Sequence, residues 1–355
     1  MTAVDVSASN ISGFGAVQLV GSLLPALEAN PGATIGTLIL PERGPIAAYT
    51  RRSAGPVRRY RRHLPNALSR ILECLWLGRR LSDGPPLLVL GDLPLRRRGR
   101  QVVLIHTAHL IPGATTSSWL ASVKYAVSRC LFRLNIGFVS HAIVQSEAMR
   151  HALEAAYPRL AGRVAVIPQP PPEWLLGAPC REPRANDGAL RLFYPAAGYP
   201  HKNHALLHAF VREGRHDPWG ASFDLTIGGA AEGAIRGWGT LAPESMLARY
   251  AEADALVFPS LAESYGLPLV EAMYLGLPIV CADRPYARSL CGDDALYFDP
   301  RSTESLAAAL AELKARLGTG WRPDWSDRLG AVPKDWGEVA ARMLALCGDD
   351  APSGR

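Results

Sequence analysis

Two glutamates with seven residues between them, Glu263 and Glu271, lie in the stretch FPSLAESYGLPLVEAMYLGLPIVCAD, residues 258–283. Between Ser264 and Ala282, Glu271 is the only charged side chain in a largely apolar run. A carboxylate that is buried without a partner costs free energy. We therefore expect Glu271 to bind a ligand that carries hydroxyl groups, such as a ribose. The alternative is a carboxylate that points outward or pairs with a nearby arginine.

The same stretch predicts a strand, a loop and a helix that would position both carboxylates. Residues 255–261 predict a buried strand, and residues 267–276 predict a helix. Ligands bind beyond the carboxyl ends of parallel strands, so we expect Glu263 to lie in a ligand-facing loop. The helix begins at Gly266 and Leu267, whose backbone N–H groups and partial positive charge suit a diphosphate.

The whole chain predicts two α/β domains. Its 355 residues exceed the usual size of one core. Strand-helix alternation implies parallel sheets with helices on both faces. We expect an N-terminal Rossmann-like domain over 1–170, a linker rich in Pro and Gly over 171–188 and a second Rossmann-like domain over 189–330. Residues 331–355 are expected to form a helix that packs back toward the first domain, and the two doubly wound domains are expected to face a cleft.

The expected elements come from local periodicity and turn residues. The expected strands lie at 2–7, 34–41, 86–92, 101–108, 141–146, 163–170, 190–196, 223–229, 255–261, 278–283 and 295–300. The expected helices lie at 17–29, 117–134, from 147, 203–211, 246–253, 267–276, 302–317 and 335–348.

Composition excludes several classes of protein. Hydrophobic residues make up 48% and charged residues 20%, which is typical of a globular protein. No apolar stretch has the length of a transmembrane helix, and the N-terminus lacks the pattern of a signal peptide, so we expect a cytoplasmic protein. The six scattered cysteines indicate reduced thiols. The absence of any D-x-D triplet gives no signal for a divalent metal ion.

Basic residues concentrate in the first half of the chain. Residues 1–180 contain 20 Lys and Arg against 9 Asp and Glu, whereas residues 181–355 contain 18 against 23. Much of the excess lies in the arginine runs at 51–52, 58–62 and 96–100. These runs predict either solvated loops or a surface for an anionic partner, such as membrane headgroups or a lipid diphosphate. Nucleic acid ranks last because no nucleic-acid-binding module accompanies them.

The segment around the two glutamates resembles the signature of family 4 glycosyltransferases, which are retaining enzymes of the two-Rossmann-domain (GT-B) fold. The resemblance implies that Glu263 holds hydroxyls of the donor sugar and that Glu271 holds the ribose of the nucleotide. It also implies that the amides of Gly266 and Leu267 meet the diphosphate. The matching positions are Pro259-Ser260, Glu263, Gly266-Leu267-Pro268, Glu271-Ala272, Gly276-x-Pro278 and the closing LYFDP.

A second block, LRLFYPAAGYPHKNHALLHAF at 190–210, resembles the first strand-loop-helix of the family's donor domain. The resemblance implies that Lys202, one of only four lysines, contacts the diphosphate and stabilises it as it leaves. Many members have an arginine five residues earlier, where this chain has Ala197. We therefore expect His201, another arginine or backbone amides to replace that cation.

The first domain carries two further similarities. NISGFGAVQLVGSLLPAL resembles the family's glycine loop, which implies that Gly13 and Gly15 approach the leaving phosphate; a tight turn is the alternative. His106 and His109 follow a predicted strand where a family histidine contacts the donor sugar, and His106 matches best. The alternative for either is a hydrogen-bonded histidine at a strand end. Ser146 is expected to be a helix N-cap.

The resemblance implies a metal-independent, retaining glycosyltransferase with no cofactor. It would move a sugar from a nucleotide-diphosphate sugar to a saccharide or lipid-linked saccharide in bacterial glycan biosynthesis. The donor would bind mainly the second domain. The acceptor would bind the basic first domain, with an anionic membrane surface as a further expected partner and nucleic acid excluded. Glu263, Lys202 and His106 are the expected catalytic residues. The expected donor-binding residues are Glu271, Gly266, Leu267, Gly13, Gly15 and His109.

Three alternatives remain open at this point. A hydrolase or epimerase of the same fold would use the carboxylates differently, a hydrolase needing a proton donor and a base or nucleophile. A catalytically degenerate subunit would bind a glycan or a partner transferase, which the missing arginine at Ala197 mildly favours. A dehydrogenase would need G-x-G-x-x-G, and SGFGAVQ lacks the third glycine.

Overall fold

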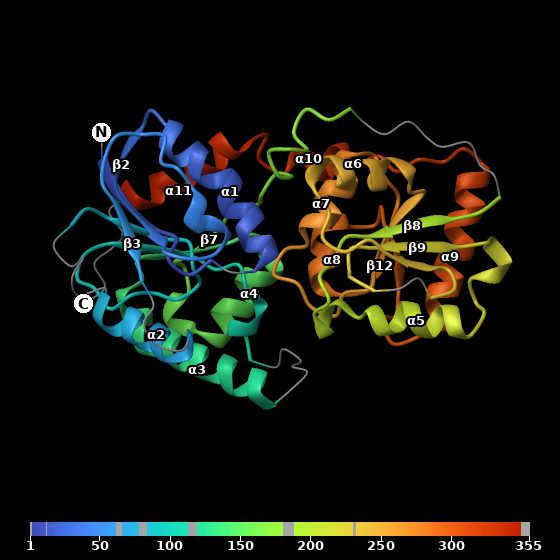
Figure 1. Cartoon of the computed structure of the whole chain (residues 1–355), viewed down its shortest axis with the longest axis horizontal. Coiled ribbons are helices and arrows are strands. Elements are labelled where there is room, and N and C mark those ends of the chain that lie inside the picture. The colour runs from blue at the N-terminus through green and yellow to red at the C-terminus, as the bar shows by residue number, and fades with distance from the viewer. Residues whose placement is uncertain are drawn as a thin grey trace. The chain divides into compact units, whose positions relative to one another are not determined.

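The computed structural model describes residues 2–11, 13–61, 66–77, 84–112, 119–179, 188–229 and 232–348. The chain divides into two compact units (Figure 1). Unit 1 comprises Met1–Pro170 and Pro333–Arg355, and unit 2 comprises Pro171–Val332.

Among its described residues, unit 1 contains a seven-stranded sheet with the order β3-β2-β1-β4-β5-β6-β7. Every neighbouring pair is parallel. In chain order the strands are β1 (Thr2–Ser7), β2 (Ala33–Pro41), β3 (Val57–Tyr60), β4 (Leu87–Val89), β5 (Gln101–Leu104), β6 (His141–Val144) and β7 (Val164–Val166).

Helices pack on both faces of this sheet. The helices of unit 1 are α1 (Phe14–Ala29), α2 (Asn66–Leu72), α3 (Trp119–Asn135), α4 (Glu147–Ala156) and α11 (Trp336–Gly348). Alternate strand residues such as Leu87 and Val89 share one core cluster with Phe132 of α3 and Met149 of α4. Helix α11 packs against α1 and against β1, β4 and β5, so the C-terminal segment completes unit 1 (Figure 1).

Unit 2 has a six-stranded sheet in its described residues, with the order β10-β9-β8-β11-β12-β13 and parallel pairing throughout. Its strands are β8 (Arg191–Tyr194), β9 (Ser222–Leu225), β10 (Ile235–Gly237), β11 (Ala255–Phe258), β12 (Ile279–Ala282) and β13 (Leu296–Phe298). Its helices are α5 (His204–Arg212), α6 (Pro243–Glu252), α7 (Leu267–Tyr274), α8 (Pro285–Cys291), α9 (Thr303–Gly318) and α10 (Ser326–Gly330).

Burial explains why these segments form strands. Every residue of β11 and β12 is buried, as expected for parallel strands covered on both faces. The predicted α/β class with two doubly wound parallel sheets is therefore confirmed. The Ser146 hydroxyl accepts a hydrogen bond from the Met149 N–H at 3.2 Å, which confirms the predicted N-cap of α4.

The segment expected to be a linker packs partly on unit 2. Leu175 is fully buried in the core cluster of unit 2. The Gly177 N–H donates to the Tyr274 hydroxyl at 2.8 Å. Residues 171–179 are thus part of the unit 2 fold, because an apolar side chain there completes its core, and residues 180–187 lie outside the described residues.

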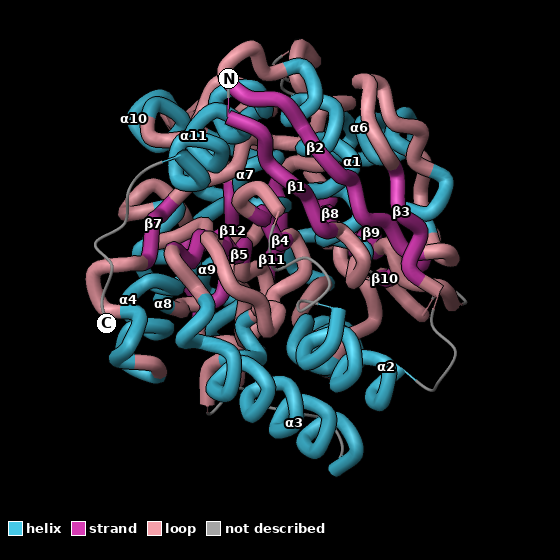
Figure 2. The backbone as a smooth tube through the Cα atoms, turned by 90° about the vertical axis from the view of Figure 1, so that its left-hand side faces the viewer, coloured by secondary structure: helices cyan, strands magenta, loops and turns pink. Residues whose placement is uncertain are grey.

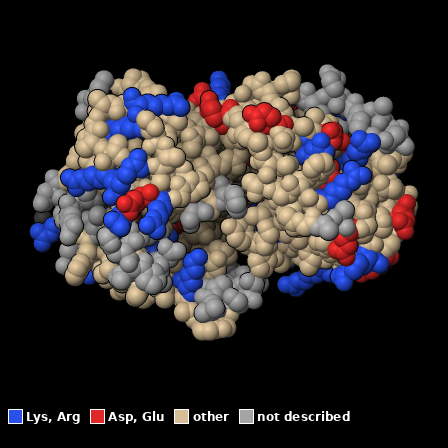
Figure 3. Space-filling model, in the orientation of Figure 1, with Lys and Arg blue, Asp and Glu red and all other residues tan. Residues whose placement is uncertain are grey.

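Some of the arginines in the basic runs stabilise the fold of unit 1. Arg97 is 1% exposed and donates to the carbonyls of Arg98, Gly84 and Pro85. Arg51 likewise donates to several backbone carbonyls. The run at 58–62 was expected to be a solvated loop or a surface for an anionic partner. Its described part belongs largely to the exposed strand β3, which corrects the loop alone; Arg62 lies outside the described residues. Lys and Arg are spread over the visible face of unit 1 in Figure 3.

Two further sequence predictions concern membrane-spanning helices and the redox state of the cysteines. In the described part of the chain, no helix combines the length and the apolar composition that crossing a membrane requires. The five described cysteines are free thiols, of which only Cys130 is exposed; Cys180 lies outside the described residues.

Candidate functional site

Each sheet has a point at which the order of its strands reverses, and several of the predicted site residues follow the strands that meet there. In unit 2 the chain passes from β8 to β9 and β10 on one side and from β11 to β12 and β13 on the other. Ligands bind beyond the carboxyl ends of the strands at such a point. Lys202 follows β8 and Glu263 follows β11, so the two residues come from adjacent strand ends.

Lys202 and Glu263 form a direct ion pair. Lys202 Nζ lies 2.5 Å from Glu263 Oε1, and the side chains are only 15% and 11% exposed. The ammonium group also lies 5.7 Å from the centre of the Phe258 ring. The low exposure places both charges where water screens them weakly, so each depends on the other for compensation.

Hydrogen bonds fix the backbone that carries Lys202. The buried Tyr194 hydroxyl donates to the Lys202 carbonyl at 2.8 Å. Asn203 adopts a left-handed conformation with φ 58°, which asparagine tolerates better than most residues. Its side-chain amide donates to the carbonyls of Pro259 and Pro300. The turn after β8 is therefore tied to the loop after β11.

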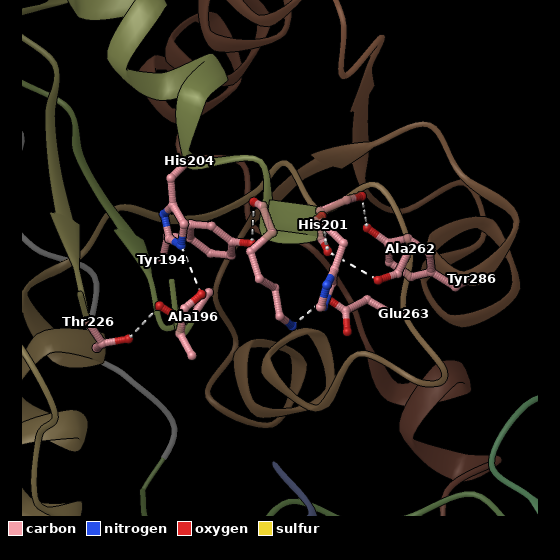
Figure 4. Close-up of polar contacts among 11 residues, drawn as sticks. Tyr194, Ala196, His201, His204, Thr226, Ala262, Glu263 and Tyr286 are labelled. Atoms are coloured by element: carbon pink, nitrogen blue, oxygen red, sulfur yellow. Dashed lines mark hydrogen bonds and ion pairs between the residues drawn. The ribbon is translucent and has the colours of Figure 1, made fainter. Parts of the chain in front are cut away.

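The loop that carries Glu263 is held from the other side. The Leu261 N–H and the Ser260 hydroxyl both donate to the His201 carbonyl, at 2.7 and 3.2 Å. The Tyr286 hydroxyl donates to the Ser260 carbonyl at 2.7 Å. In Figure 4, Tyr194 and Glu263 lie on either side of the turn that these bonds stabilise. The ion pair is thus preorganised by backbone contacts.

Burial and the charge of Glu263 affect the phenols nearby. Burial is the main cause that raises the pKa of Tyr194 well above its usual range, and the Glu263 carboxylate adds to it. The same two causes, in the same order, raise the pKa of Tyr286. Both phenols therefore stay protonated at neutral pH and act as hydrogen-bond donors to the backbone.

Helix α7 begins at a glycine that its backbone requires. Gly266 has φ 102° and ψ 56°, and a Cβ there would lie 3.0 Å from Leu269 Cδ1. Pro268 lies in the first turn, where its missing N–H removes no intrahelical bond. Because the Leu269 N–H already donates to the Gly266 carbonyl at 2.9 Å, the first turn of α7 offers an anion the N–H of Leu267.

Glu271 has a protein partner. Its side chain is buried, and Oε2 accepts a hydrogen bond of 2.5 Å from the Tyr250 hydroxyl of α6. Burial and the Glu271 carboxylate raise the pKa of Tyr250 well above its usual range, so the phenol remains the donor. The outward-pointing alternative is excluded. The Tyr250 hydroxyl makes the contact with Glu271 that was expected from a ribose hydroxyl. Nothing in the sequence indicated this contact, because Tyr250 lies in the pattern of an ordinary buried aromatic residue.

The switch point of unit 1 lies between β1 and β4 and carries the predicted glycines. Gly13 is the N-cap of α1, with φ −80°, and Gly15 lies in its first turn. Apart from the neighbouring residues and the backbone of the helix itself, no described atom would lie within 4 Å of a Cβ at either position. Neither backbone strain nor packing therefore requires glycine at these positions. The missing side chains leave space beside the start of α1.

His106 follows β5 and is held by Asp92, which sequence analysis missed. Asp92 follows β4 and has φ 65°. Its Oδ1 accepts from the His106 N–H at 2.8 Å, and its Oδ2 lies 3.2 Å from His106 Nε2. An acidic residue directly after a buried strand was the signal that would have identified it. The His109 ring instead stacks on Tyr125 of α3, with ring centres 3.9 Å apart.

Metal ligands do not cluster in the described chain. Among its described residues, no group of three or more His, Cys, Asp or Glu side chains is arranged to hold a metal ion. The candidate site groups are instead an ion pair, a hydrogen-bonded carboxylate, a histidine-aspartate pair and two helix N-termini.

Sequence comparison identifies relatives of part of unit 2. A family model described as Glycosyl transferases group 1 matches residues 209–316, which include Glu263, Gly266 and Glu271. O-antigen chain mannosyltransferase B of Escherichia coli is 35% identical over 100 residues, which are 28% of this chain and 26% of that protein. The alignments span about a quarter or less of the length of the curated relatives. Lys202 and the whole of unit 1 lie outside the matched family segment.

Solved structures share the fold over nearly the whole chain. Sucrose-phosphate synthase from Thermosynechococcus elongatus has a TM-score of 0.67 and 16% identity, with 98% of both chains covered. The apo form of the lipopolysaccharide outer core galactosyltransferase WaaB has a TM-score of 0.64 and 12% identity, covering 98% of this chain and 99% of the other. The expected resemblance is confirmed: residues 209–316 match the Glycosyl transferases group 1 family, and the chain has the fold of the GT-B glycosyltransferases.

Proposed function

We propose that the protein is a hexosyltransferase that moves a sugar from a nucleotide-diphosphate sugar to a saccharide or lipid-linked saccharide acceptor in bacterial cell-surface glycan synthesis. The observation that carries this proposal is the Lys202–Glu263 pair at the switch point of unit 2. The Lys202 ammonium group and the N-terminus of α7 suit the negative charge of a diphosphate. The Glu263 carboxylate can accept hydrogen bonds from the hydroxyls of the sugar. The matched family segment and the O-antigen mannosyltransferase support it.

Each part of the donor has a proposed partner in unit 2. Lys202 and the amides at Gly266 and Leu267 bind the diphosphate, where they stabilise charge that grows as the bond to the sugar breaks. Glu263 accepts hydrogen bonds from sugar hydroxyls, and Glu271 binds the ribose beside Tyr250. The family's usual arginine is replaced by Ala197, which contributes a carbonyl that contacts His204 Nε2 at 3.1 Å.

Unit 1 is proposed to bind the acceptor and to add contacts to the donor. The space at Gly13 and Gly15 admits the leaving phosphate. His106, oriented by Asp92, contacts the donor sugar at the reacting carbon. His109 is proposed to contact the donor less closely than His106 does, because its ring is stacked on Tyr125. The basic surface of unit 1 favours an anionic lipid-linked acceptor.

The proposed transfer is metal-independent and retains the configuration at the anomeric carbon. The acceptor oxygen forms a bond to that carbon on the face from which the phosphate oxygen departs. The bond from carbon to phosphate breaks with its electron pair on the phosphate, which takes the acceptor proton. Lys202 compensates the negative charge left on the diphosphate.

A product assay tests this function. The full chain is incubated with nucleotide-diphosphate sugars and candidate saccharide acceptors, with and without a chelator, and products are identified by NMR. We expect acceptor-dependent release of the nucleoside diphosphate, an unchanged rate with the chelator and a retained anomeric configuration. Release that ignores the acceptor would indicate a hydrolase, and binding without turnover would indicate a degenerate subunit.

A further inference from the structure

Two helical segments on the outside of unit 1 expose large apolar side chains. The segments are α2 with the π-helical turn that follows it (Glu73–Leu77), and α3. They hold six of the nine large hydrophobic side chains that are exposed in the described chain. These six are Leu68 (52% exposed), Leu72 (38%), Trp76 (63%), Trp119 (72%), Val123 (51%) and Leu134 (59%).

The exposed side chains form stripes along the helices. Leu68, Leu72 and Trp76 are spaced four residues apart, as are Trp119 and Val123, so each set lies on one helical face. The opposite faces are already buried, because Cys74, Leu131 and Phe132 belong to the core of unit 1. The stripes are therefore additional to the faces that hold the fold together. Figures 1 and 2 both show α2 and α3 side by side.

The exposed charged side chains on these segments are all positive. In residues 66–77 and 119–135 the only acidic residue is Glu73, which is 2% exposed. The basic residues there are Arg70, Lys124, Arg129 and Arg133, of which Lys124 and Arg133 are exposed. The outer surface of α2, its following turn and α3 thus combines tryptophans, aliphatic side chains and positive charge without an exposed carboxylate.

We propose that this α2–α3 face seats unit 1 on the surface of an anionic lipid bilayer. Tryptophan prefers the depth of the headgroups, aliphatic side chains enter the acyl boundary, and Lys and Arg extend toward lipid phosphates. The charge argues for a bilayer, because a protein partner would have to match positive charge within an apolar contact, whereas an anionic membrane presents negative charge over its whole surface. The inference does not depend on the proposed transfer reaction.

The proposal assigns membrane contact to helices rather than to the arginine runs. Arg97 and Arg51 already bind carbonyls of unit 1, and Arg59 donates to the Ala47 carbonyl. Positive charge in the runs adds long-range attraction at most. The apolar stripes instead supply contacts that salt does not screen.

Sedimentation with vesicles tests the proposal. The full chain is mixed with phosphatidylcholine vesicles that contain or lack phosphatidylglycerol, and the bound fraction is measured. We expect binding to the anionic vesicles only, weakened by added salt. The double variant Trp119→Gln/Val123→Gln should lower the partition coefficient by roughly tenfold or more, because two exposed apolar side chains no longer enter the lipid. Lys124→Gln/Arg133→Gln should lower it by about fivefold for each charge removed.

Matched controls separate this face from other surfaces. Trp238→Gln removes a tryptophan of unit 2 that is 42% exposed, and Arg58→Gln removes an exposed arginine of β3. Both should bind vesicles nearly as the unaltered chain does. The variants of the α2–α3 face and Arg58→Gln change exposed side chains, so their unfolding midpoints should stay close to that of the unaltered chain, which excludes misfolding as the cause. Trp238→Gln also removes the hydrogen bond from Nε1 to Asp224 and the contact of the ring with Arg249, so its midpoint should fall while its vesicle binding stays the same.

Two results would overturn the proposal. One is unchanged vesicle binding in Trp119→Gln/Val123→Gln. The other is self-association in the absence of lipid that the same double variant abolishes, which would make the face an interface between copies of the chain. Donor titrations without lipid are independent of both results, so a failure here leaves the proposed function untouched.

Discussion

Lys202 and Glu263 lie at the ends of two adjacent strands, and their side chains meet at 2.5 Å from Nζ to Oε1. The pair is little exposed and rests on backbone contacts between the turn after β8 and the loop after β11. It satisfies both charges in the absence of a ligand. A diphosphate would offer Lys202 a competing anion, and sugar hydroxyls would offer Glu263 a new partner, so the pair is suited to exchange its contacts when a donor binds.

The first prediction concerns the stability of this ion pair. Lys202→Met should lower the free energy of unfolding by roughly 1–3 kcal/mol, because it leaves the Glu263 carboxylate in a poorly hydrated place without its cation. Adding Glu263→Gln should recover much of the loss, since the unpaired charge is then removed. Urea denaturation measures both. A double variant no more stable than Lys202→Met would contradict the expected coupling.

The second prediction concerns the partner of Glu271. Tyr250→Phe removes the hydroxyl that donates to Oε2 and should cost about 1–3 kcal/mol of stability, because a buried carboxylate loses a hydrogen bond. Tyr199→Phe is the matched control, since Tyr199 is 45% exposed and should change stability by less than about 0.5 kcal/mol. Equal effects of the two substitutions in urea denaturation would show that the buried contact is unimportant.

The third prediction separates folding from ligand binding at the start of α1. Gly15→Ala should raise stability by roughly 0.5–1 kcal/mol, because alanine favours a helix and the new Cβ meets no described atom within 4 Å outside its neighbours and the helix backbone. It should nevertheless slow transfer, because the methyl group occupies space proposed for the leaving phosphate. Gly21→Ala lies deeper in the same helix, also with open space, and should gain stability without loss of transfer. Normal transfer by Gly15→Ala would remove Gly15 from the site.

The fourth prediction concerns pH. Burial, the largest cause, lowers the pKa of His204 in the folded chain. Its Nε2 donates to the Ala197 carbonyl, and a proton on Nδ1 would have no acceptor among the described residues. As the pH falls below about 6.5, the unfolded chain takes up a proton that the folded chain does not, so stability decreases.

Thermal unfolding between pH 5 and pH 8 checks this sign. His204→Gln should flatten the decline in the unfolding midpoint at low pH. His151→Gln, which removes an exposed imidazole of α4, should leave it in place. A His204→Gln curve parallel to that of the unaltered chain would show that His204 does not contribute.

The sequence predicted the central strands because they depend on local pattern. Residues 279–282 are apolar without interruption, and such a run between turn residues indicates a strand buried on both faces. Glu263 was predicted from its loop after such a strand, whereas Lys202 was predicted from the resemblance of residues 190–210 to a family segment. Their direct contact was not predicted, because it depends on β8 and β11 being neighbours in the sheet.

Elements with weak or contrary patterns were missed. Strand β3 has the sequence VRRY and lies at the sheet edge, where charged residues replace the alternation that marks a half-buried strand. Tyr250 was missed as the partner of Glu271 because a hydrogen bond between distant residues leaves no local trace. Asp92 did carry a signal, its place directly after a buried strand, but nothing in the sequence indicated that it would contact His106. The exposed stripe on α2 went unpredicted because that helix was not expected.

The central claim is that unit 2 binds a nucleotide-diphosphate sugar through Lys202. Its most direct test is a calorimetric titration of the full chain with UDP-, GDP-, ADP- and dTDP-sugars, repeated with Lys202→Met and with Lys334→Met, which removes an exposed lysine elsewhere. We predict that one nucleotide class binds, that Lys202→Met weakens its binding by about tenfold or more through loss of a charge-assisted contact, and that Lys334→Met binds normally. Binding of no donor, or equal binding by Lys202→Met, would contradict the claim.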